Sequence, residues 1–274
     1  MEITARRIGD AVRGATVESA AAPGMNVLKT YDPPLGELAG RTVTGVRRRG
    51  KHLIVDFDGL SLLLHLMSAG RLQLYDKRAG PRDRTSRILV RLADGRELRL
   101  REFGTKQRAW AKLLPTDEVE QDEAIATLGP EAWPDLPPAA LLSGAARPLH
   151  SLLRDQHVLA GVGRSWADEI LHAAELSPFK RGSDLTPAEA DTLAETIPAV
   201  LGDALEHYER TVWLPIPDKL PMPLTVHRHE GEDCPRCGTA LERVWFEDYV
   251  IAYCPACQTD GRVLKDRRLS RLLK

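Results

Sequence analysis

Two Cys-x-x-Cys pairs near the C-terminal end constrain the fold of this chain more than any other feature. The first motif comprises Cys234 and Cys237, and the second comprises Cys254 and Cys257. The 16 residues 238–253 separate the two motifs. Each Cys-x-x-Cys turn directs two sulfurs toward one point, and an intervening hairpin brings the two turns together. The spacing predicts a four-thiolate zinc ribbon. Zinc in such a site is structural, because four protein ligands leave no position for water.

The residues around the cysteines favour a hairpin. The stretch 241–253 is rich in Val, Trp, Phe, Tyr and Ile, and Pro235, Gly238 and Pro255 supply turn residues. The alternatives are two disulfides or a redox dithiol. The first 25 residues lack the pattern of a secretory signal, and disulfides are uncommon without export. Zinc is therefore the favoured interpretation, although zinc ribbons serve in several classes of nucleic-acid protein.

The length and composition are those of an ordinary globular protein. The 274 residues are enough for two or three domains, with 43% hydrophobic and 28% charged residues. No run of about 18 apolar residues occurs, which argues against a membrane-spanning helix. We expect a cytoplasmic protein, which in a bacterium has access to the nucleoid.

The net charge of −1 conceals a segregated distribution. Residues 71–112 hold 13 Lys and Arg against 5 Asp and Glu, and residues 41–51 hold five bases and no acid. Residues 258–274 hold six bases and two acids. Segregated charge of this kind presents a basic surface to phosphates. The alternative is that arginines simply alternate outward from a half-buried sheet.

Hydrophobic periodicity divides the chain. Residues 1–13 form an amphipathic helical pattern without an N-cap, with Ile3, Ile8 and Val12 on one face. From residue 16 to about 114 the period is two, which predicts a sandwich or barrel. The predicted strands are 42–46, 52–57, 62–66, 88–92 and 97–100, with turns at Asp58-Gly59 and Asp94-Gly95.

The second half of the chain has a helical pattern. After a proline-rich linker, helices are predicted from Leu149, across 165–174 and across 187–207, the last with Thr186 as N-cap and Glu189 three residues on. Gly161-x-Gly163 separates the first two helices and brings amide groups close to a ligand. The free positive end of the following helix suits a phosphate.

Segment 152–171 resembles the helix–two-turn–helix of the formamidopyrimidine-DNA glycosylase / endonuclease VIII family, with Arg164 where the family has Asn. Other segments resemble the same family in collinear order, which is more specific than any one of them. They are the lysine-bearing turn (49–53), the void-filling loop (65–72), the Arg-Arg-Phe-Gly loop (101–104) and the terminal zinc finger (234–258).

The resemblance implies an α+β fold in three parts. These are an N-terminal β-sandwich with a helix (1–116), a helix-two-turn-helix DNA-binding domain (117–224), and a zinc-ribbon hairpin with a basic tail (225–274). It implies a base-excision-repair DNA glycosylase with AP lyase activity, which flips a damaged base out and nicks abasic DNA through a Schiff base. The implied partner is double-stranded DNA with a damaged base or abasic site. The protein is expected to act as a monomer and to have no membrane partner.

The family opens with Pro-Glu-Leu-Pro-Glu, whose proline amine attacks the sugar and whose glutamate handles protons. This sequence lacks that opening, and Met1–Arg7 matches the family from just after it. We expect a start codon assigned one short segment too late. The alternatives are a catalytically dead protein that recognises damaged or abasic DNA, and a zinc-ribbon protein unrelated to repair. Met1-Glu2 is not equated with Pro-Glu, since that register destroys the match through the first helix.

The resemblance assigns roles to single residues. Lys51 resembles the lysine that contacts phosphate and assists proton transfer, and Arg101 and Phe103 resemble the residues that fill the space left by the flipped base. The implied DNA contacts are His65, Arg101, Phe103, His150, Arg164 and Arg262. The alternatives are a surface position for Lys51, a core position for Phe103 and structural roles for the two histidines.

Three departures from the family pattern fall in the implied DNA-binding loops. Glu102 replaces the second arginine of the Arg-Arg-Phe-Gly loop, and Met67-Ser68 stand where the family has Gly-Met. Tyr249 stands five residues before the third cysteine, where the family carries an arginine tied to the second backbone cut. We therefore expect weak δ-elimination. The basic residues after Gln258 either supply a cation in place of the missing arginine or contact successive phosphates of the backbone. Lesion and opposite-base preference stay open.

Overall fold

The computed structural model describes residues 1–80, 83–103, 106–246 and 249–265, and the chain divides into two compact units. Unit 1 comprises Met1–Thr127 and Tyr208–Pro221, and unit 2 comprises Leu128–His207 and Met222–Lys274. The segment 208–221 thus groups with the N-terminal unit. The three-part division expected from the sequence remains a prediction.

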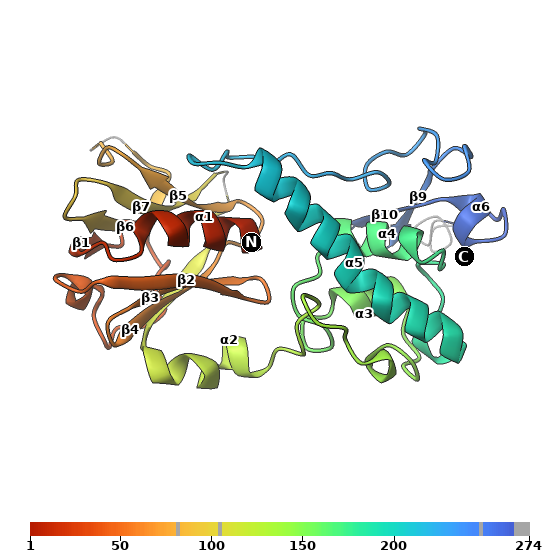
Figure 1. The fold of residues 1–274 in the computed structure, drawn as a ribbon, viewed down its shortest axis with the longest axis horizontal. Helices are drawn as coiled ribbons and strands as arrows, with labels where there is room; N and C mark the ends of the chain where they lie inside the picture. The colour runs from red at the N-terminus through yellow and green to blue at the C-terminus, as the bar shows by residue number, and fades with distance from the viewer. Residues whose placement is uncertain (81–82, 104–105, 247–248, 266–274) are drawn as a thin grey trace. The chain divides into compact units, whose positions relative to one another are not determined.

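Unit 1 contains two four-stranded antiparallel sheets, whose strands appear in red to yellow in Figure 1. One sheet has the order β1 (Val17–Ala21), β6 (Ser86–Leu92), β7 (Glu97–Glu102) and β5 (Gly70–Tyr75). The other has the order β2 (Val43–Arg49), β3 (His52–Phe57), β4 (Leu60–His65) and β8 (Trp110–Pro115). The predicted β-sandwich is confirmed.

Each of the five predicted strands overlaps an observed one. Asp58-Gly59 joins β3 to β4, and Asp94-Gly95 lies between β6 and β7, with φ of 78° at Gly59 and 92° at Gly95. These positive values explain why both turns carry glycine. Strands β1 and β8 were not predicted, because their apolar residues do not alternate regularly. Strand β5 was not predicted, because the resemblance assigns residues 65–72 to a loop.

Helix α1 (Glu2–Val12) forms as predicted and has no side-chain N-cap. Ile3, Ile8 and Val12 are all at most 2% exposed, and burial of each such side chain contributes about 1.5–3 kcal/mol. A Cβ on Gly9 would lie 3.5 Å from Val46, so the helix lies close over β2. Unit 1 also contains η1 (Leu35–Leu38), η2 (Thr116–Gln121) and α2 (Glu123–Ala126).

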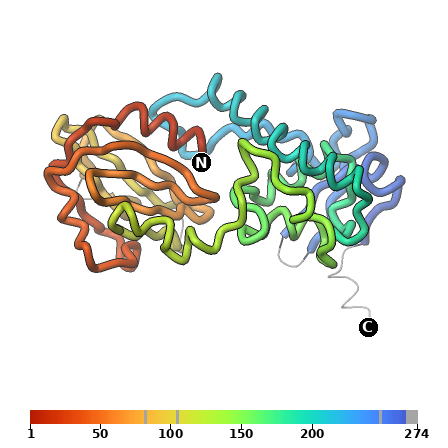
Figure 2. Tube along the Cα trace, turned by 60° about the horizontal axis from the view of Figure 1, so that its bottom comes forward, coloured from red at the N-terminus to blue at the C-terminus, as the bar shows by residue number. Residues whose placement is uncertain are grey.

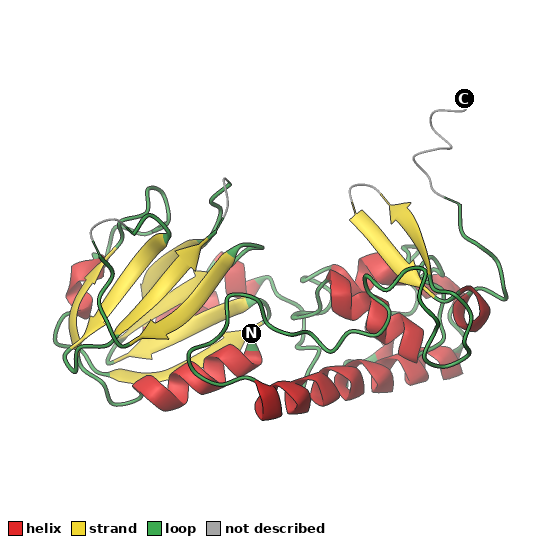
Figure 3. Ribbon diagram, turned by 90° about the horizontal axis from the view of Figure 1, so that it is seen from above, coloured by secondary structure: helices red, strands yellow, loops and turns green. Residues whose placement is uncertain are grey.

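Unit 2 is mainly helical, and Figure 2 traces its chain from green to blue. Its elements are η3 (Ala139–Leu141), α3 (Leu149–Arg154), α4 (Arg164–Ala173), η4 (Gly182–Asp184), α5 (Pro187–Thr211), β9 (Glu242–Phe246), β10 (Tyr249–Tyr253) and α6 (Pro255–Gln258). Residues of α3, α4 and α5 share one apolar core. The antiparallel β9–β10 hairpin is visible beside these helices in Figure 3.

Helix α5 begins with the predicted capping box. The Glu189 N–H donates to Thr186 Oγ1 (3.3 Å), and the Thr186 N–H donates to Glu189 Oε2 (2.9 Å). The helix runs four residues beyond its predicted end at His207. Among the described residues, no helix is both long and apolar enough to cross a membrane.

Candidate nucleic-acid interface and metal centre

The four cysteines converge in unit 2. Their Sγ atoms all lie within 4.8 Å of one another, with 3.9 Å between Cys234 and Cys257 and 3.5 Å between Cys237 and Cys254. A tetrahedral zinc about 2.3 Å from each sulfur requires sulfurs about 3.8 Å apart, whereas a disulfide requires about 2.05 Å. All four cysteines are free thiols. The donor set therefore fits a metal ion in a closed four-thiolate site.

The end of α4 is attached to this cysteine cluster. His172 Nε2 lies 3.2 Å from Cys234 Sγ. The Arg236 guanidinium, between the first two cysteines, donates to the carbonyl oxygens of His172 (3.2 Å) and Ala173 (3.1 Å). A cation at the last carbonyls of a helix satisfies groups that have no partner inside the helix.

The middle of α4 holds the segment that leads to the cysteines. Buried Glu169 accepts four hydrogen bonds: from the Thr225 N–H (3.1 Å) and hydroxyl (2.8 Å), the Val226 N–H (2.9 Å) and the His227 N–H (2.8 Å). A buried carboxylate with this many donors is fully satisfied. Glu169 therefore fixes residues 225–227 against α4.

The neighbouring Asp168 forms a second buried network. Its Oδ2 accepts from His227 Nδ1 (2.6 Å) and the Ala252 N–H (3.2 Å), and its Oδ1 lies 3.1 Å from His150 Nε2. His150 is 1% exposed, and burial lowers its pKa despite the opposing effect of Asp168. A phosphate contact requires an exposed ring nitrogen, so this placement favours the structural alternative for His150.

The two-turn loop between α3 and α4 is closed by Gln156. Its side chain donates to the carbonyl oxygens of Arg154 (2.9 Å) and Val162 (3.0 Å) and accepts the Gly161 N–H (3.0 Å). Gly161 has φ of 104°, which only glycine adopts readily. The exposed Arg164 then begins α4, behind Gly163 as an N-cap without a side chain. The predicted glycine turn between the two helices is therefore present, and its contact with a phosphate stays a prediction.

In unit 1, Lys51 occupies a two-residue turn between β2 and β3. Arg49 pairs with His52 across the turn, and Gly50 has φ of 55°. His65 pairs with His52 on the neighbouring strand. Burial lowers the pKa of His65, and the charge of Lys51 adds to this effect. Lys51 and His65 thus lie close together at one end of the sheet.

His52 and His65 form an aromatic cluster with Trp110. The ring centroids are 4.8 Å apart between the histidines, and those of His52 and His65 lie 5.5 and 5.7 Å from Trp110. Burial lowers the pKa of His52 to about 4, so this ring is neutral at neutral pH. His65 Nδ1 accepts the Met67 N–H (3.0 Å).

The loop from β4 to β5 crosses between the two sheets and carries Met67, whose side chain is 43% exposed. A Cβ on Gly70 would lie 2.4 Å from the Leu66 carbonyl oxygen, so the crossing requires glycine. The Phe103 N–H donates to the Ala69 carbonyl (3.2 Å). The end of β7 is thereby held beside the Met67 loop.

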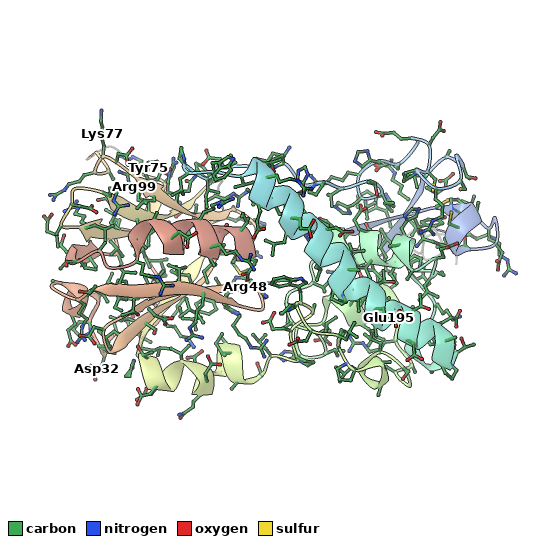
Figure 4. All side chains as sticks on the ribbon, viewed as in Figure 1. Asp32, Arg48, Tyr75, Lys77, Arg99 and Glu195 are labelled. Atoms are coloured by element: carbon green, nitrogen blue, oxygen red, sulfur yellow. The ribbon has the colours of Figure 1, made fainter. Side chains whose placement is uncertain are left out.

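Arg101 and Phe103 lie together at that end of β7. Arg101 donates to Thr85 Oγ1 (2.9 Å) and to the Tyr75 hydroxyl (2.6 Å), and its guanidinium lies 4.6 Å from the centroid of the Phe103 ring. Figure 4 labels Tyr75, which also contacts the Arg99 guanidinium. Both predicted void-filling residues are half-buried. Gly104 of the predicted loop lies outside the described residues.

Glu102 is buried rather than presented to a ligand. It is 2% exposed and accepts the N–H groups of Arg108 (2.6 Å) and Ala109 (2.8 Å). The strand period explains this, since Arg101 and Phe103 point to one face and Glu102 to the other. Glu102 therefore closes the base of the loop that follows β7.

Glu2 is paired with arginines. Its two oxygens accept from Arg6 (2.9 Å) and from Arg48 (3.1 Å), and these bonds lower its pKa although burial opposes the shift. Arg48 is labelled in Figure 4. An ionised, doubly paired carboxylate is poorly suited to proton transfer, which agrees with the interpretation that Met1-Glu2 is not the Pro-Glu of the family.

Arg262 lies just beyond α6 and is exposed, with its backbone tied to Thr259 by two hydrogen bonds of 2.9 and 2.6 Å. Lys265 is exposed as well. The later basic residues of the tail, Arg267, Arg268 and Arg271, lie outside the described residues.

Sequence reasoning missed Glu169 and His172, which attach α4 to the cysteine module, and Arg154, considered below. One signal for the first two was available. Asp168 and Glu169 stand between the apolar residues Ala167 and Ile170, and residues 167–172 are all buried, so this part of α4 is enclosed on every side. A buried acidic pair implies donors elsewhere in the chain, although the sequence does not name them.

The fold is that of solved formamidopyrimidine-DNA glycosylases. A complex of Lactococcus lactis Fpg with DNA containing an abasic site aligns with a TM-score of 0.83 at 24% identity, covering 94% of this chain and 97% of that one. The L. lactis enzyme with DNA containing N7-benzyl-Fapy-dG gives 0.84 at the same identity and coverage. The class of fold is therefore the two-sheet, helix-two-turn-helix fold seen in these solved structures.

Sequence comparisons are more specific. Models of the formamidopyrimidine-DNA glycosylase N-terminal domain and H2TH domain match residues 1–106 and 138–214. The Enterococcus faecalis formamidopyrimidine-DNA glycosylase is 31% identical over 246 residues, 85% of this chain and 84% of that protein. An uncharacterized formamidopyrimidine-DNA glycosylase-like protein of Mycobacterium tuberculosis is 40% identical over 151 residues, 54% of this chain and 94% of the relative. The chain belongs to the formamidopyrimidine-DNA glycosylase family.

Proposed function

We propose that this protein is a base-excision-repair DNA glycosylase with AP lyase activity, acting on double-stranded DNA with a damaged base or an abasic site. The observation that carries the proposal is the match of both family domains to one chain that also brings four thiolates together. A bacterial enzyme of this kind works on the nucleoid.

Unit 1 contributes the groups that act on the damaged nucleotide. Lys51 contacts a phosphate and assists proton transfer beside the neutral His65. Arg101, Phe103 and the exposed Met67 fill the space left by a flipped base, and the hydrogen bond between Phe103 and Ala69 supports this joint role. Replacing lost stacking with aromatic or long side chains offsets the cost of unstacking.

Unit 2 contributes DNA backbone contacts and the metal site. Arg164 and the first turn of α4 contact a phosphate, and Arg262 follows the backbone. The four cysteines hold a zinc ion, because thiolates at these spacings suit zinc and the closed donor set leaves no position for water. Zinc supplies no chemistry there. It ties the Cys234–Cys237 turn to the Cys254–Cys257 turn at the end of β10.

The lyase step is tested by borohydride trapping on abasic duplex DNA. The chain is compared with the same chain preceded by Pro-Glu-Leu-Pro-Glu, because the printed sequence lacks this segment. A trapped adduct is expected for the extended chain, and weaker trapping is expected after Lys51→Ala than after Lys29→Ala, an exposed control. Absence of an adduct with the extended chain would contradict lyase activity.

The second candidate function is recognition of damaged or abasic DNA without cleavage. The arginine pairing of the Glu2 carboxylate favours it for the chain as printed, since this acid is not free to move a proton. Tighter binding to abasic than to intact duplex, without trapping in either form of the protein, would favour this candidate. Equal affinity for both duplexes would instead favour a zinc-ribbon protein unrelated to repair.

A further inference from the structure

Two arginines from different helices converge on one buried tyrosine in unit 2. The guanidinium carbon of Arg154, the last residue of α3, lies 3.9 Å from the centroid of the Tyr249 ring. That of Arg164, the first residue of α4, lies 5.1 Å from the same centroid. Tyr249 begins β10 and is only 4% exposed, so its ring is buried beneath both cations.

Tyr249 is held from other sides by aromatic neighbours. The His150 ring stacks on it, with centroids 5.5 Å apart and an interplanar angle of 23°. Phe246 contacts it edge-on at 5.7 Å. The electron-rich face of a tyrosine attracts guanidinium groups and orients them. The ring therefore sets the positions of both arginines.

Among the described residues, which do not include Glu247 and Asp248, no counter-charge faces the two cations. Within the part of the chain that the structure describes, neither guanidinium donates a hydrogen bond, and no carboxylate lies within ion-pair distance of either one. Nearby carboxylates are engaged elsewhere: Asp155 pairs with Arg147, and Asp168 lies between two histidines. The pKa of His150 is lowered mainly by burial, and the charges of Arg154 and Arg164 lower it further.

We propose that Arg154 and Arg164, positioned by Tyr249, form a two-guanidinium clamp for one phosphodiester group of the DNA backbone. Guanidinium forks match phosphate oxygens bidentately, and an anion between two cations offsets their mutual repulsion. The free N–H groups at the start of α4 lie next to Arg164 and add donors. Tyr249 is thus a positioning residue, and Arg154 is a DNA contact additional to those implied by the sequence.

This inference rests on the proposed function, because DNA supplies the phosphate. The test measures the affinity of the full chain for a duplex containing a tetrahydrofuran abasic analogue between about 50 and 200 mM salt. Each phosphate contact contributes about 0.9 to the slope of log affinity against log salt. Arg154→Gln should reduce the slope by about one and weaken binding roughly tenfold.

The tyrosine is tested with matched variants. Tyr249→Phe keeps the ring and should bind as the unchanged protein does. Tyr249→Leu removes the π face and should weaken binding nearly as much as Arg154→Gln, with little further loss when both are combined. The control is Arg243→Gln on β9, whose guanidinium already pairs with Glu230 at 2.8 Å and should leave the slope unchanged.

Each outcome is decisive. An unchanged slope and affinity in Arg154→Gln, with DNA bound normally, would overturn the clamp and leave the proposed function intact. Failure of the unchanged protein to bind DNA would overturn both. Equal losses for Tyr249→Phe and Tyr249→Leu would overturn the positioning role of the ring. Zinc content and thermal unfolding identify a misfolded Leu variant, and Arg154→Gln, at a half-buried position, then decides alone.

Discussion

Arg87 and Glu102 form a buried ion pair on the adjacent strands β6 and β7, with 3.7 Å between Arg87 Nε and Glu102 Oε2. Their side chains are 9% and 1% exposed. Arg87 also donates to the Met25 carbonyl (2.7 Å) and to Gln107 Oε1 (2.6 Å). The pair therefore ties together two loops at one end of the sheet, including the segment that follows Phe103.

Glu102→Ala should destabilise the protein by about 3 kcal/mol or more, because it leaves the Arg87 charge buried without its partner. Urea unfolding measures the loss. Glu102→Arg, which restores the arginine of the family loop, should be worse still, since two guanidiniums would be buried together. A variant carrying Glu102→Arg with unchanged stability would contradict the buried pair. The double variant Arg87→Met with Glu102→Leu should lose less than the two single changes combined.

The stability of the protein should fall as the pH is lowered from 7 to 5, in part because of His52. The unfolded imidazole takes up a proton near its ordinary pKa of about 6.5, whereas the folded one does so near 4. Above pH 6.5 both states are neutral and His52 contributes nothing. At pH 5 it costs about 2 kcal/mol. His52→Phe, which keeps the contacts with His65 and Trp110, should flatten the dependence, and an unchanged pH slope would count against a buried neutral His52.

Retention of zinc should depend on His172. With zinc bound as proposed, the ring nitrogen 3.2 Å from Cys234 Sγ is placed to donate to the thiolate, and partners of this kind affect metal affinity about 10- to 100-fold. His172→Phe should therefore release zinc to a chromogenic chelator faster than the unchanged protein. His157→Phe, an exposed change on the two-turn loop, is the control. Identical release from the His172 variant would argue that the contact is incidental.

Glu169→Ala should loosen the attachment of the cysteine module. It leaves the donors of residues 225–227 without an acceptor inside the protein, at a cost of about 3 kcal/mol or more. Hydrogen exchange should rise at those amides first. Exchange that rises equally across α1 and the sandwich would indicate global unfolding instead. Glu195→Ala on the exposed face of α5, labelled in Figure 4, should change neither property.

The sequence predicted the features that local chemistry determines. The Cys-x-x-Cys spacing, the Asp-Gly turns and the Thr186–Glu189 capping box each depend on residues close in the chain, and each is present in the structure. Strand β5 was missed because the resemblance assigns residues 65–72 to a loop, and what covers its polar face depends on distant residues. Gln73 is buried there, where its amide donates to the Ile216 carbonyl (2.7 Å), a partner 143 residues away.

The site was harder to predict for the same reason. Lys51, Arg101 and Arg164 came from motifs with fixed spacing. The burial of His150 depends on Asp168 and Tyr249, which belong to different elements. Tyr249 was identified in the sequence as the loss of an arginine. The contacts of its ring with the guanidinium groups of Arg154 and Arg164 could not be predicted, because they form only when α3, α4 and β10 are folded together.

The division of the chain has a consequence for its synthesis. Unit 1 includes residues 208–221, and Gln73 reaches its partner Ile216 in that segment. The ribosome therefore completes the strands of the sandwich long before it makes the last piece that packs on them. Residues 128–207 emerge from the ribosomal exit tunnel after these strands and before residues 208–221. Unit 1 cannot be completed until residues 208–221 have left the ribosome, and until then water takes the place of the Ile216 carbonyl on the Gln73 amide.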